Sequence, residues 1–197
     1  KADSKLLGQG ELEIQSRIPI GAGLGSSAAL CVAVARFVLW KTQSQVDHWI
    51  PLATHLEDVF HGKSSGMDVN VIAHSQPILY SMADKSKLLP EIKKLPRFEL
   101  FDSGKRAQTR DCIKQVGTQP EMTRPGLDQK MEEATQLSLE ALREYPENPH
   151  AAEAKLARAM NQAQAFFEAG GLVPTELLEQ KNKLLTQGAL AVPITGA

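Results

Sequence analysis

Apolar and polar residues alternate over Glu11–Ile18, which is typical of a strand with one buried face. Ala28–Trp40 follows as an expected helix that is apolar on all sides for about nine residues, up to Arg36, which predicts a buried core helix. Further on, apolar residues recur at helical spacing over Val46–Phe60 and from about Ser65 to His74. The first half of the chain is therefore expected to be one strand followed by three helices.

The second half of the chain is expected to begin with short strands and to become helical. The expected strands are Pro77–Met82, its hairpin partner Lys87–Leu95, and Pro96–Ser103. The expected helices are Lys105–Val116, Pro125–Tyr145, His150–Ala169 and Pro174–Thr186, and a strand-like run follows at Ala189–Ile194. Strands with helices laid on one side indicate an α+β class, and we place a domain boundary between residues 1–95 and 96–197.

Composition argues against several kinds of partner. The 197 residues carry a formal net charge of −1, so nothing indicates nucleic acid or an anionic membrane surface as a partner. The sequence has neither a signal peptide nor an apolar run long enough to cross a bilayer. Its two cysteines, Cys31 and Cys112, have no metal-ligand spacing, which favours reduced structural thiols in a cytoplasmic protein.

Three glycines at alternate positions separate the first strand from the first helix. Residues 19–29 read Pro-Ile-Gly-Ala-Gly-Leu-Gly-Ser-Ser-Ala-Ala. Glycine tolerates positive φ and has no Cβ, so this backbone can wrap closely around a ligand. Ser26 and Ser27 are candidates for the helix N-cap. The N–H groups at the helix start and the helix dipole predict an anion site suited to phosphate. A plain tight turn is the alternative.

The loop differs from the two best-known phosphate motifs. No Gly-Lys-Ser/Thr follows the glycines, as a Walker loop requires, and the third glycine comes too early for a dinucleotide fingerprint. The pattern resembles instead the phosphate loop of the GHMP kinases, Pro-x-Gly-x-Gly-Leu-Gly/Ser-Ser-Ala. The resemblance implies that the ATP phosphates are bound by Gly21, Ala22, Gly23, Leu24, Gly25, Ser26 and Ser27.

A second stretch places carboxylates at the ends of two neighbouring helices. Glu57 lies on the last turn of one expected helix and Asp68 on the first turn of the next, with two glycines between them for a tight turn. A carboxylate at a helix N-terminus is stabilised as the anion. Local sequence alone therefore favours a simple dipole-complementing role for Asp68, and an ordinary helix-end role for His61.

Residues 61–68 read His-Gly-Lys-Ser-Ser-Gly-Met-Asp. They resemble the second signature of mevalonate kinases within that family, His-Gly-x-x-Ser-Gly-x-Asp. The resemblance implies the following roles: Asp68 as the base for the substrate hydroxyl, Ser27 and Glu57 as Mg²⁺ ligands, and His61 and Ser65 beside the substrate. Magnesium prefers oxygen ligands and keeps several waters, so one hydroxyl and one carboxylate suffice.

Fainter resemblances extend along the chain. Leu100–Thr109 is similar to the segment that opens the family's C-terminal domain, which implies that Ser103 lies near the catalytic Asp. Residues 194–197, Ile-Thr-Gly-Ala, resemble the start of the third family motif. The chain departs from the family pattern at Ser64, where Pro is usual, and at Val69, where Asn often follows the Asp.

Taken over the whole chain, the resemblance implies a GHMP-kinase-like two-domain fold truncated at both ends. Its parts would be a ribosomal S5 domain 2-like part and a helix-rich ferredoxin-like C-terminal part. The expected reaction transfers the γ-phosphate of ATP, with Mg²⁺, to a primary alcohol, with mevalonate as first choice in isoprenoid biosynthesis. The fragment is expected to be nearly inactive alone, because a Lys from the family's N-terminal portion is absent.

Two other functions stay open at this point. The first is another GHMP kinase, acting on phosphomevalonate, homoserine or a sugar. The second is a non-catalytic protein of the same fold that binds a ligand. In each case the expected partners are small molecules, with neither nucleic acid nor a membrane, and a homodimer is left open.

Overall fold

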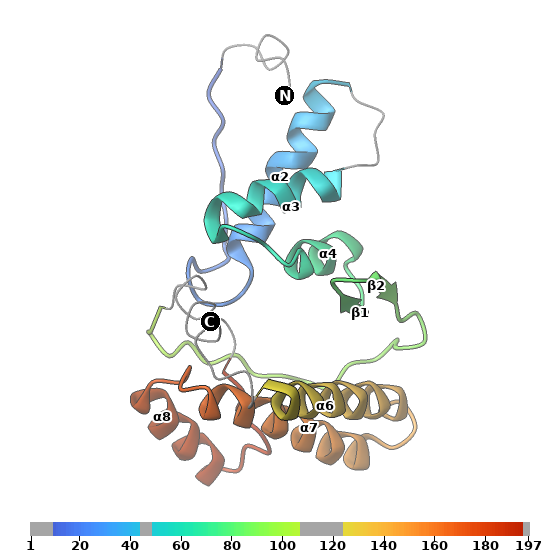
Figure 1. The fold of residues 1–197 in the computed structure, drawn as a ribbon, viewed down its shortest axis with the longest axis vertical. Helices are drawn as coiled ribbons and strands as arrows, with labels where there is room; N and C mark the ends of the chain where they lie inside the picture. The colour runs from blue at the N-terminus through green and yellow to red at the C-terminus, as the bar shows by residue number, and fades with distance from the viewer. Residues whose placement is uncertain (1–9, 44–48, 107–123, 195–197) are drawn as a thin grey trace. The chain divides into compact units, whose positions relative to one another are not determined.

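A computed structural model describes residues 10–43, 49–106 and 124–194, which fall into two compact units, Lys1–Pro90 and Glu91–Ala197. The elements in chain order are α2 (Ser26–Lys41), α3 (Trp49–His61), α4 (Met67–His74), β1 (Ile78–Ser81), β2 (Lys85–Leu88), α6 (Arg124–Glu144), α7 (Pro149–Ala169) and α8 (Thr175–Thr186) (Figure 1). Helices with one small sheet confirm the α+β class. In the described ranges, every helix is too short or too polar to cross a membrane.

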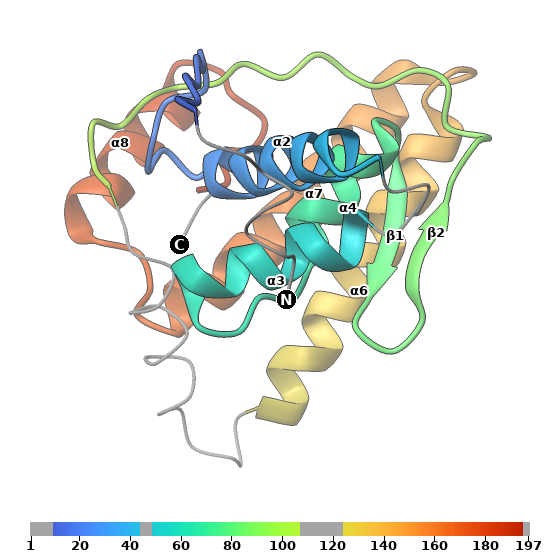
Figure 2. The same ribbon diagram turned by 90° about the horizontal axis from the view of Figure 1, so that it is seen from above.

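The first unit is built on small residues that let three helices approach closely. Helix α2 packs against α3, and α4 contacts both of them and the hairpin (Figures 1 and 2). Ala28, Ala35 and Ala53 are completely buried where these helices meet. The prediction of a helix buried on all sides is wrong for α2, because Trp40 is 72% exposed. Its buried residues lie on the side that faces α3 and α4.

The hairpin follows α4 directly. Strand β1 pairs with β2 in antiparallel fashion, with Ile78 opposite Leu88 and Ser81 opposite Lys85. The backbone N–H of Leu89 also donates to the carbonyl of Pro77, which closes the open end of the pair. The predicted hairpin is confirmed, but its second strand is Lys85–Leu88 and not Lys87–Leu95, so it begins two residues earlier and ends seven residues earlier than expected.

Three expected strands are wrong. Residues 11–18, 96–103 and 189–194 form no strand, because β1 and β2 make up the whole sheet in the described part of the chain. A strand needs a neighbour to supply its ladder of hydrogen bonds, and alternation alone cannot provide one. Leu12 and Ile14 accordingly remain about half exposed. The helix expected over Lys105–Val116 lies almost wholly outside the described residues.

The second unit is an antiparallel helix pair with a third helix attached. Helices α6 and α7 lie side by side (Figure 1) and pack through buried alanines. Helix α7 begins at Pro149, and the side chain of Asn148 accepts a hydrogen bond from the backbone of Ala151. The helices expected over 125–145, 150–169 and 174–186 are confirmed to within one residue at each end.

Candidate functional site

The glycine-rich loop has the backbone that its sequence predicts. Gly21, Gly23 and Gly25 have φ values of 70°, 70° and 67°, a left-handed conformation that side-chain-bearing residues rarely adopt. Gly25 is the N-cap of α2, and no side chain caps the helix. The prediction of a serine N-cap is therefore wrong. Because the glycine turns the chain, Ser26 and Ser27 already lie within the first helical turn.

Because α2 begins directly after Gly25, the backbone N–H groups of its first turn face the glycine-rich loop. The first intrahelical hydrogen bond runs from the N–H of Ala29 to the carbonyl of Gly25, at 2.9 Å. The three N–H groups that precede it have no acceptor within the helix, and the positive end of the dipole lies at the same place. The arrangement has the chemistry of a phosphate site.

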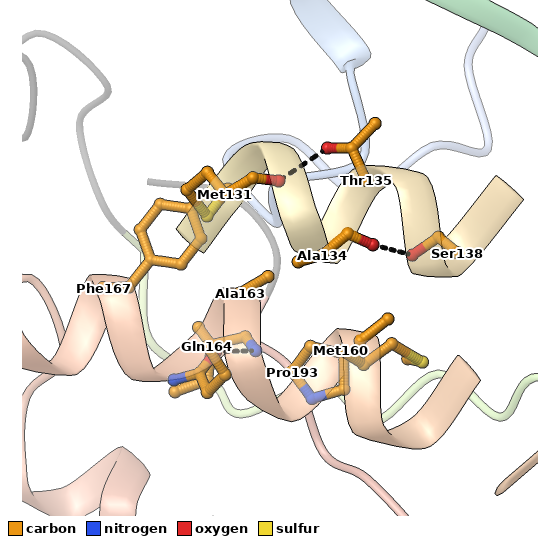
Figure 3. A pocket seen from close by; sticks show the side chains of 11 residues that line it. Met131, Ala134, Thr135, Ser138, Met160, Ala163, Gln164, Phe167 and Pro193 are labelled. Carbon is orange, nitrogen blue, oxygen red and sulfur yellow. Dashed lines mark hydrogen bonds between the residues drawn. The ribbon is translucent and has the colours of Figure 1, made fainter. Parts of the chain in front are cut away.

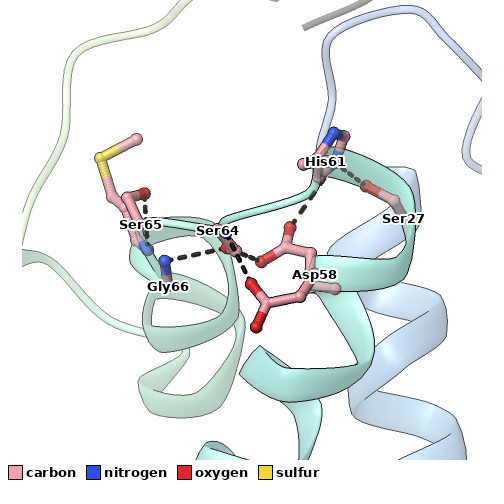
Figure 4. A network of polar contacts seen from close by, with 8 residues as sticks. Ser27, Asp58, His61, Ser64, Ser65 and Gly66 are labelled. Carbon is pink, nitrogen blue, oxygen red and sulfur yellow. Dashed lines mark hydrogen bonds and ion pairs between the residues drawn. The ribbon is translucent and has the colours of Figure 1, made fainter. Parts of the chain in front are cut away.

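Helix α3 brings Glu57 and His61 to the same end of α2. The Glu57 side chain is only 3% exposed, and its Oε1 lies 4.0 Å from Nε2 of His61. The same Nε2 is hydrogen-bonded to the Ser27 hydroxyl at 3.1 Å (Figure 4). Ser27 and Glu57, the two expected metal ligands, thus face one imidazole nitrogen from neighbouring helices.

The turn between α3 and α4 is held by hydrogen bonds centred on Ser64. Its hydroxyl donates to Oε2 of Glu57 at 2.5 Å and accepts the N–H of Gly66 at 3.0 Å. Its backbone N–H donates to the carboxylate of Asp58 at 2.7 Å (Figure 4). The turn is consequently fixed to the last part of α3.

Gly66, the N-cap of α4, is packed tightly between two other elements. Its φ is 79°, and a Cβ placed there would lie 3.3 Å from both Cγ2 of Thr54 and the hydroxyl of Tyr80. The Tyr80 hydroxyl donates to the carbonyl of Ser65, so strand β1 also holds this turn. These contacts fix the direction in which α4 leaves the turn.

Asp68 lies on the first turn of α4 and faces the glycine loop. A Cβ placed on Gly25 would lie 3.9 Å from Oδ2 of Asp68. Gly25 and Asp68, more than forty residues apart in the sequence, therefore meet in space, and with them the two motifs. The geometry brings together the glycine loop, Ser27, Glu57, His61 and Asp68.

The charge balance of the site is one-sided. Among the residues that the structure describes, no lysine or arginine forms an ion pair with Glu57 or Asp68. Burial raises the pKa of the Cys31 thiol, and the nearby charge of Glu57 adds to this rise.

A buried carboxylate without a cation is costly. The donor set, one hydroxyl and one buried carboxylate, therefore fits a hard divalent cation that also binds phosphate.

No fuller protein cage for a metal exists in the described ranges, where no group of three or more His, Cys, Asp or Glu could hold an ion.

The remaining expected residues are less closely tied to this cluster. The Ser65 side chain is exposed and accepts the N–H of Met67 at 3.3 Å. Ser103 belongs to the second unit, where its hydroxyl accepts the N–H of Lys105 at 3.3 Å. The placing of Ser103 near the catalytic Asp therefore stays a prediction.

The sequence analysis missed three residues that hold the site. Ser64 enters the sequence analysis only as a departure from the family pattern, because its hydrogen bonds reach Asp58 and Glu57, six and seven residues away. Thr54 and Tyr80 gave no signal, because their contacts with Gly66 bring together residues far apart in the chain.

A separate cavity of about 180 Å³ lies in the second unit, between α6 and α7 (Figure 3). Its wall includes Met131, Ala163 and Phe167. The hydroxyls of Thr135 and Ser138 on this wall donate to carbonyls of their own helix. The lining is mainly apolar and contains no residue of the two motifs.

Comparison with known proteins agrees with the two motifs. Residues 2–76 match the family described as GHMP kinases N terminal domain. A mevalonate kinase of Pyrococcus horikoshii is 30% identical over 95% of this chain and 56% of its own length. One from Thermococcus gammatolerans is 31% identical over 94% of this chain and 56% of its own length. One from Arabidopsis thaliana is 36% identical over 38% of this chain and 24% of its own length.

The resemblance expected from the motifs is thereby confirmed. No solved structure matches the chain. The chain spans 56% of the length of the Pyrococcus and Thermococcus relatives. The activity of a whole protein that contains this chain is therefore proposed below.

Proposed function

Residues 2–76 of this chain belong to the GHMP kinase N-terminal domains, and we infer that the chain provides the phosphate loop and the acidic residues of a small-molecule kinase. The whole protein would transfer the γ-phosphate of ATP to the primary alcohol of mevalonate. One observation carries this proposal: the carboxylate of Asp68 lies against Gly25, the last glycine of the loop. A phosphate on the loop would then have a carboxylate beside it.

The loop and the start of α2 would hold the nucleotide. Backbone N–H groups and the helix dipole stabilise negative charge on phosphate oxygens without having to reorganise. The left-handed backbone at Gly21, Gly23 and Gly25 keeps Cβ atoms away from the path of the phosphates. In this way residues 21–27 would bind the phosphates of ATP.

Ser27 and Glu57 would hold Mg²⁺, because the Ser27 hydroxyl and Oε1 of Glu57 lie beside the same imidazole from neighbouring helices, and both are oxygen donors. Bound there, the cation offsets the charge that phosphoryl transfer develops on the phosphate oxygens. The burial of Glu57 without a lysine or arginine partner in the described part of the chain supports this role.

Asp68 would act on the acceptor alcohol. As the bond between the alcohol oxygen and the γ-phosphorus forms, the hydroxyl proton passes to the carboxylate, and the bond to the β-phosphate oxygen breaks to release ADP. We propose His61, Ser65 and Ser103 as residues beside the acceptor. The choice of mevalonate rests on the names of the relatives, and an acceptor that already carries a phosphate would contradict it.

The decisive experiment is Asp68→Asn in the whole protein, assayed by ADP release with ATP and a panel of acceptor alcohols. Loss of the base lowers turnover by about 10²–10⁴-fold. Nucleotide affinity, measured by calorimetry, changes little because the loop is intact. Asp84→Asn is the matched control, since Asp84 is an exposed carboxylate in the hairpin turn.

Two results would count against the proposal. Turnover that survives Asp68→Asn would exclude a base at this position. A wild-type protein that binds nucleotide but releases no ADP with any alcohol would indicate a binding protein of the same fold.

A further inference from the structure

Ser64 connects two parts of the site that the family pattern treats separately. Its hydroxyl donates to Oε2 of Glu57 and accepts the N–H of Gly66. Its own N–H donates to Asp58. Ser64 therefore makes three hydrogen bonds within one turn (Figure 4).

The first bond distinguishes the two oxygens of Glu57. Oε2 is taken by the Ser64 hydroxyl at 2.5 Å, whereas Oε1 faces His61 and, through it, Ser27. A carboxylate with one oxygen held in this way cannot rotate freely. Oε1 is left as the oxygen directed toward the proposed cation.

The second bond reaches the helix that carries Asp68. Gly66 is the N-cap of α4, and Asp68 is the second residue of that helix. The Gly66 N–H donates to the Ser64 hydroxyl, which itself donates to Glu57. The start of α4 is therefore connected to the Glu57 carboxylate through Ser64. A shift of Glu57 would be passed to the turn from which Asp68 projects.

Proline, the residue expected here from the family pattern, could make none of these three bonds, because it has neither a hydroxyl nor a backbone N–H. The network is thus a property of this chain and does not follow from the signature.

We propose that Ser64 is a positioning residue that presents Oε1 of Glu57 to the divalent cation and couples that carboxylate to the start of α4. This rests on the proposed function, because it takes Glu57 as the metal ligand. Partners that orient a metal ligand typically contribute about 10–100-fold to metal affinity.

The test measures Mn²⁺ binding to the whole protein in the presence of ADP, by the electron paramagnetic resonance signal of free Mn²⁺. Ser64→Ala is expected to weaken Mn²⁺ binding about tenfold, while the affinity for ADP without metal stays the same. Ser64→Thr keeps the hydroxyl and is expected to restore most of the affinity. Ser81→Ala, in the hairpin, is the matched control.

Each outcome is decisive. An unchanged Mn²⁺ affinity in Ser64→Ala overturns the proposal, and so does an equal loss of metal-free ADP binding, which would indicate general damage to the fold. Should Ser64→Ala not fold, Ser64→Cys replaces it, since a thiol is a weaker donor and predicts an intermediate loss. A wild-type whole protein that binds neither Mn²⁺ nor ADP would instead refute the kinase site itself.

Discussion

Each unit contains a glutamate at the centre of a polar network, and the two networks balance charge differently. Glu168 in the second unit pairs with Lys181 at 2.5 Å and accepts the amide of Gln164 at 3.1 Å. The hydrogen bond from Lys181 is the main reason why the pKa of Glu168 lies below its ordinary value. Glu57 in the first unit is more deeply buried, yet its partners are a hydroxyl and an imidazole.

The difference separates a structural carboxylate from a candidate binding carboxylate. Glu168 has its cation supplied by α8, so its charge contributes to holding α7 and α8 together. Glu57 has no lysine or arginine partner among the described residues. A buried carboxylate is costly in free energy unless it is hydrogen-bonded and paired, and Glu57 is hydrogen-bonded but has no lysine or arginine beside it in the described ranges.

The largest effect is expected from Glu57→Gln, which removes the charge and keeps the shape. We expect Mn²⁺ binding in the presence of ADP to fall by about 100-fold. The free energy of unfolding should stay the same or rise, because no buried charge remains. Chemical denaturation and metal titration measure the two quantities on one sample.

Glu168→Gln is the matched control for that experiment, since it should lower stability and leave metal binding unchanged. A loss of Mn²⁺ affinity in both variants, or in neither, would remove the distinction between the two carboxylates.

The next effect concerns the turn that holds Glu57. Gly66→Ala forces a left-handed alanine and places its methyl group 3.3 Å from Thr54 and Tyr80. We expect a loss of about 2–3 kcal/mol in the free energy of unfolding. Gly62→Ala has a similar φ of 83° but open space around it, so it should lose only about 1 kcal/mol. Urea denaturation of both variants gives the comparison.

Equal losses in the two variants would show that backbone strain alone matters and that the contacts with Thr54 and Tyr80 contribute nothing.

The smallest effect is the acid sensitivity of Glu168. Because its pKa in the folded chain lies below the ordinary 4.5, the unfolded chain binds the proton more readily. The stabilisation is therefore complete above pH 4.5 and is lost as the pH falls below that value. We expect the free energy of unfolding of the wild type to exceed that of Glu168→Gln by about 1 kcal/mol at neutral pH. This difference should vanish in acid, as measured by urea denaturation at a series of pH values. A gap that persists at low pH would assign the effect to packing.

The sequence was most informative where local geometry decides the structure. Alternate glycines predicted the left-handed loop, and helical spacing placed α4, α6, α7 and α8 within one or two residues. The same reasoning failed for the strand expected over residues 11–18, because a strand depends on a partner elsewhere in the chain.

The candidate site shows the same difference between features set by local sequence and features set by contacts between distant elements. The acidic residues came from a motif, whereas the hydrogen bonds of Ser64 and the contact of Tyr80 with Gly66 arise only when separate elements meet. The pairing of Glu168 with Lys181 joins two helices across thirteen positions, a spacing that no single-helix pattern contains.

The crowding at Gly66 has a genetic consequence. A helix, a turn and a hairpin converge on a space where a methyl group would fit only if Thr54 or Tyr80 moved by a few tenths of an ångström. An alanine inherited at this position would be tolerated best in a background that already carries a smaller residue at Thr54 or a shorter one at Tyr80. The three positions should therefore mutate in a constrained order, and revertants of Gly66→Ala are expected to map to the other two.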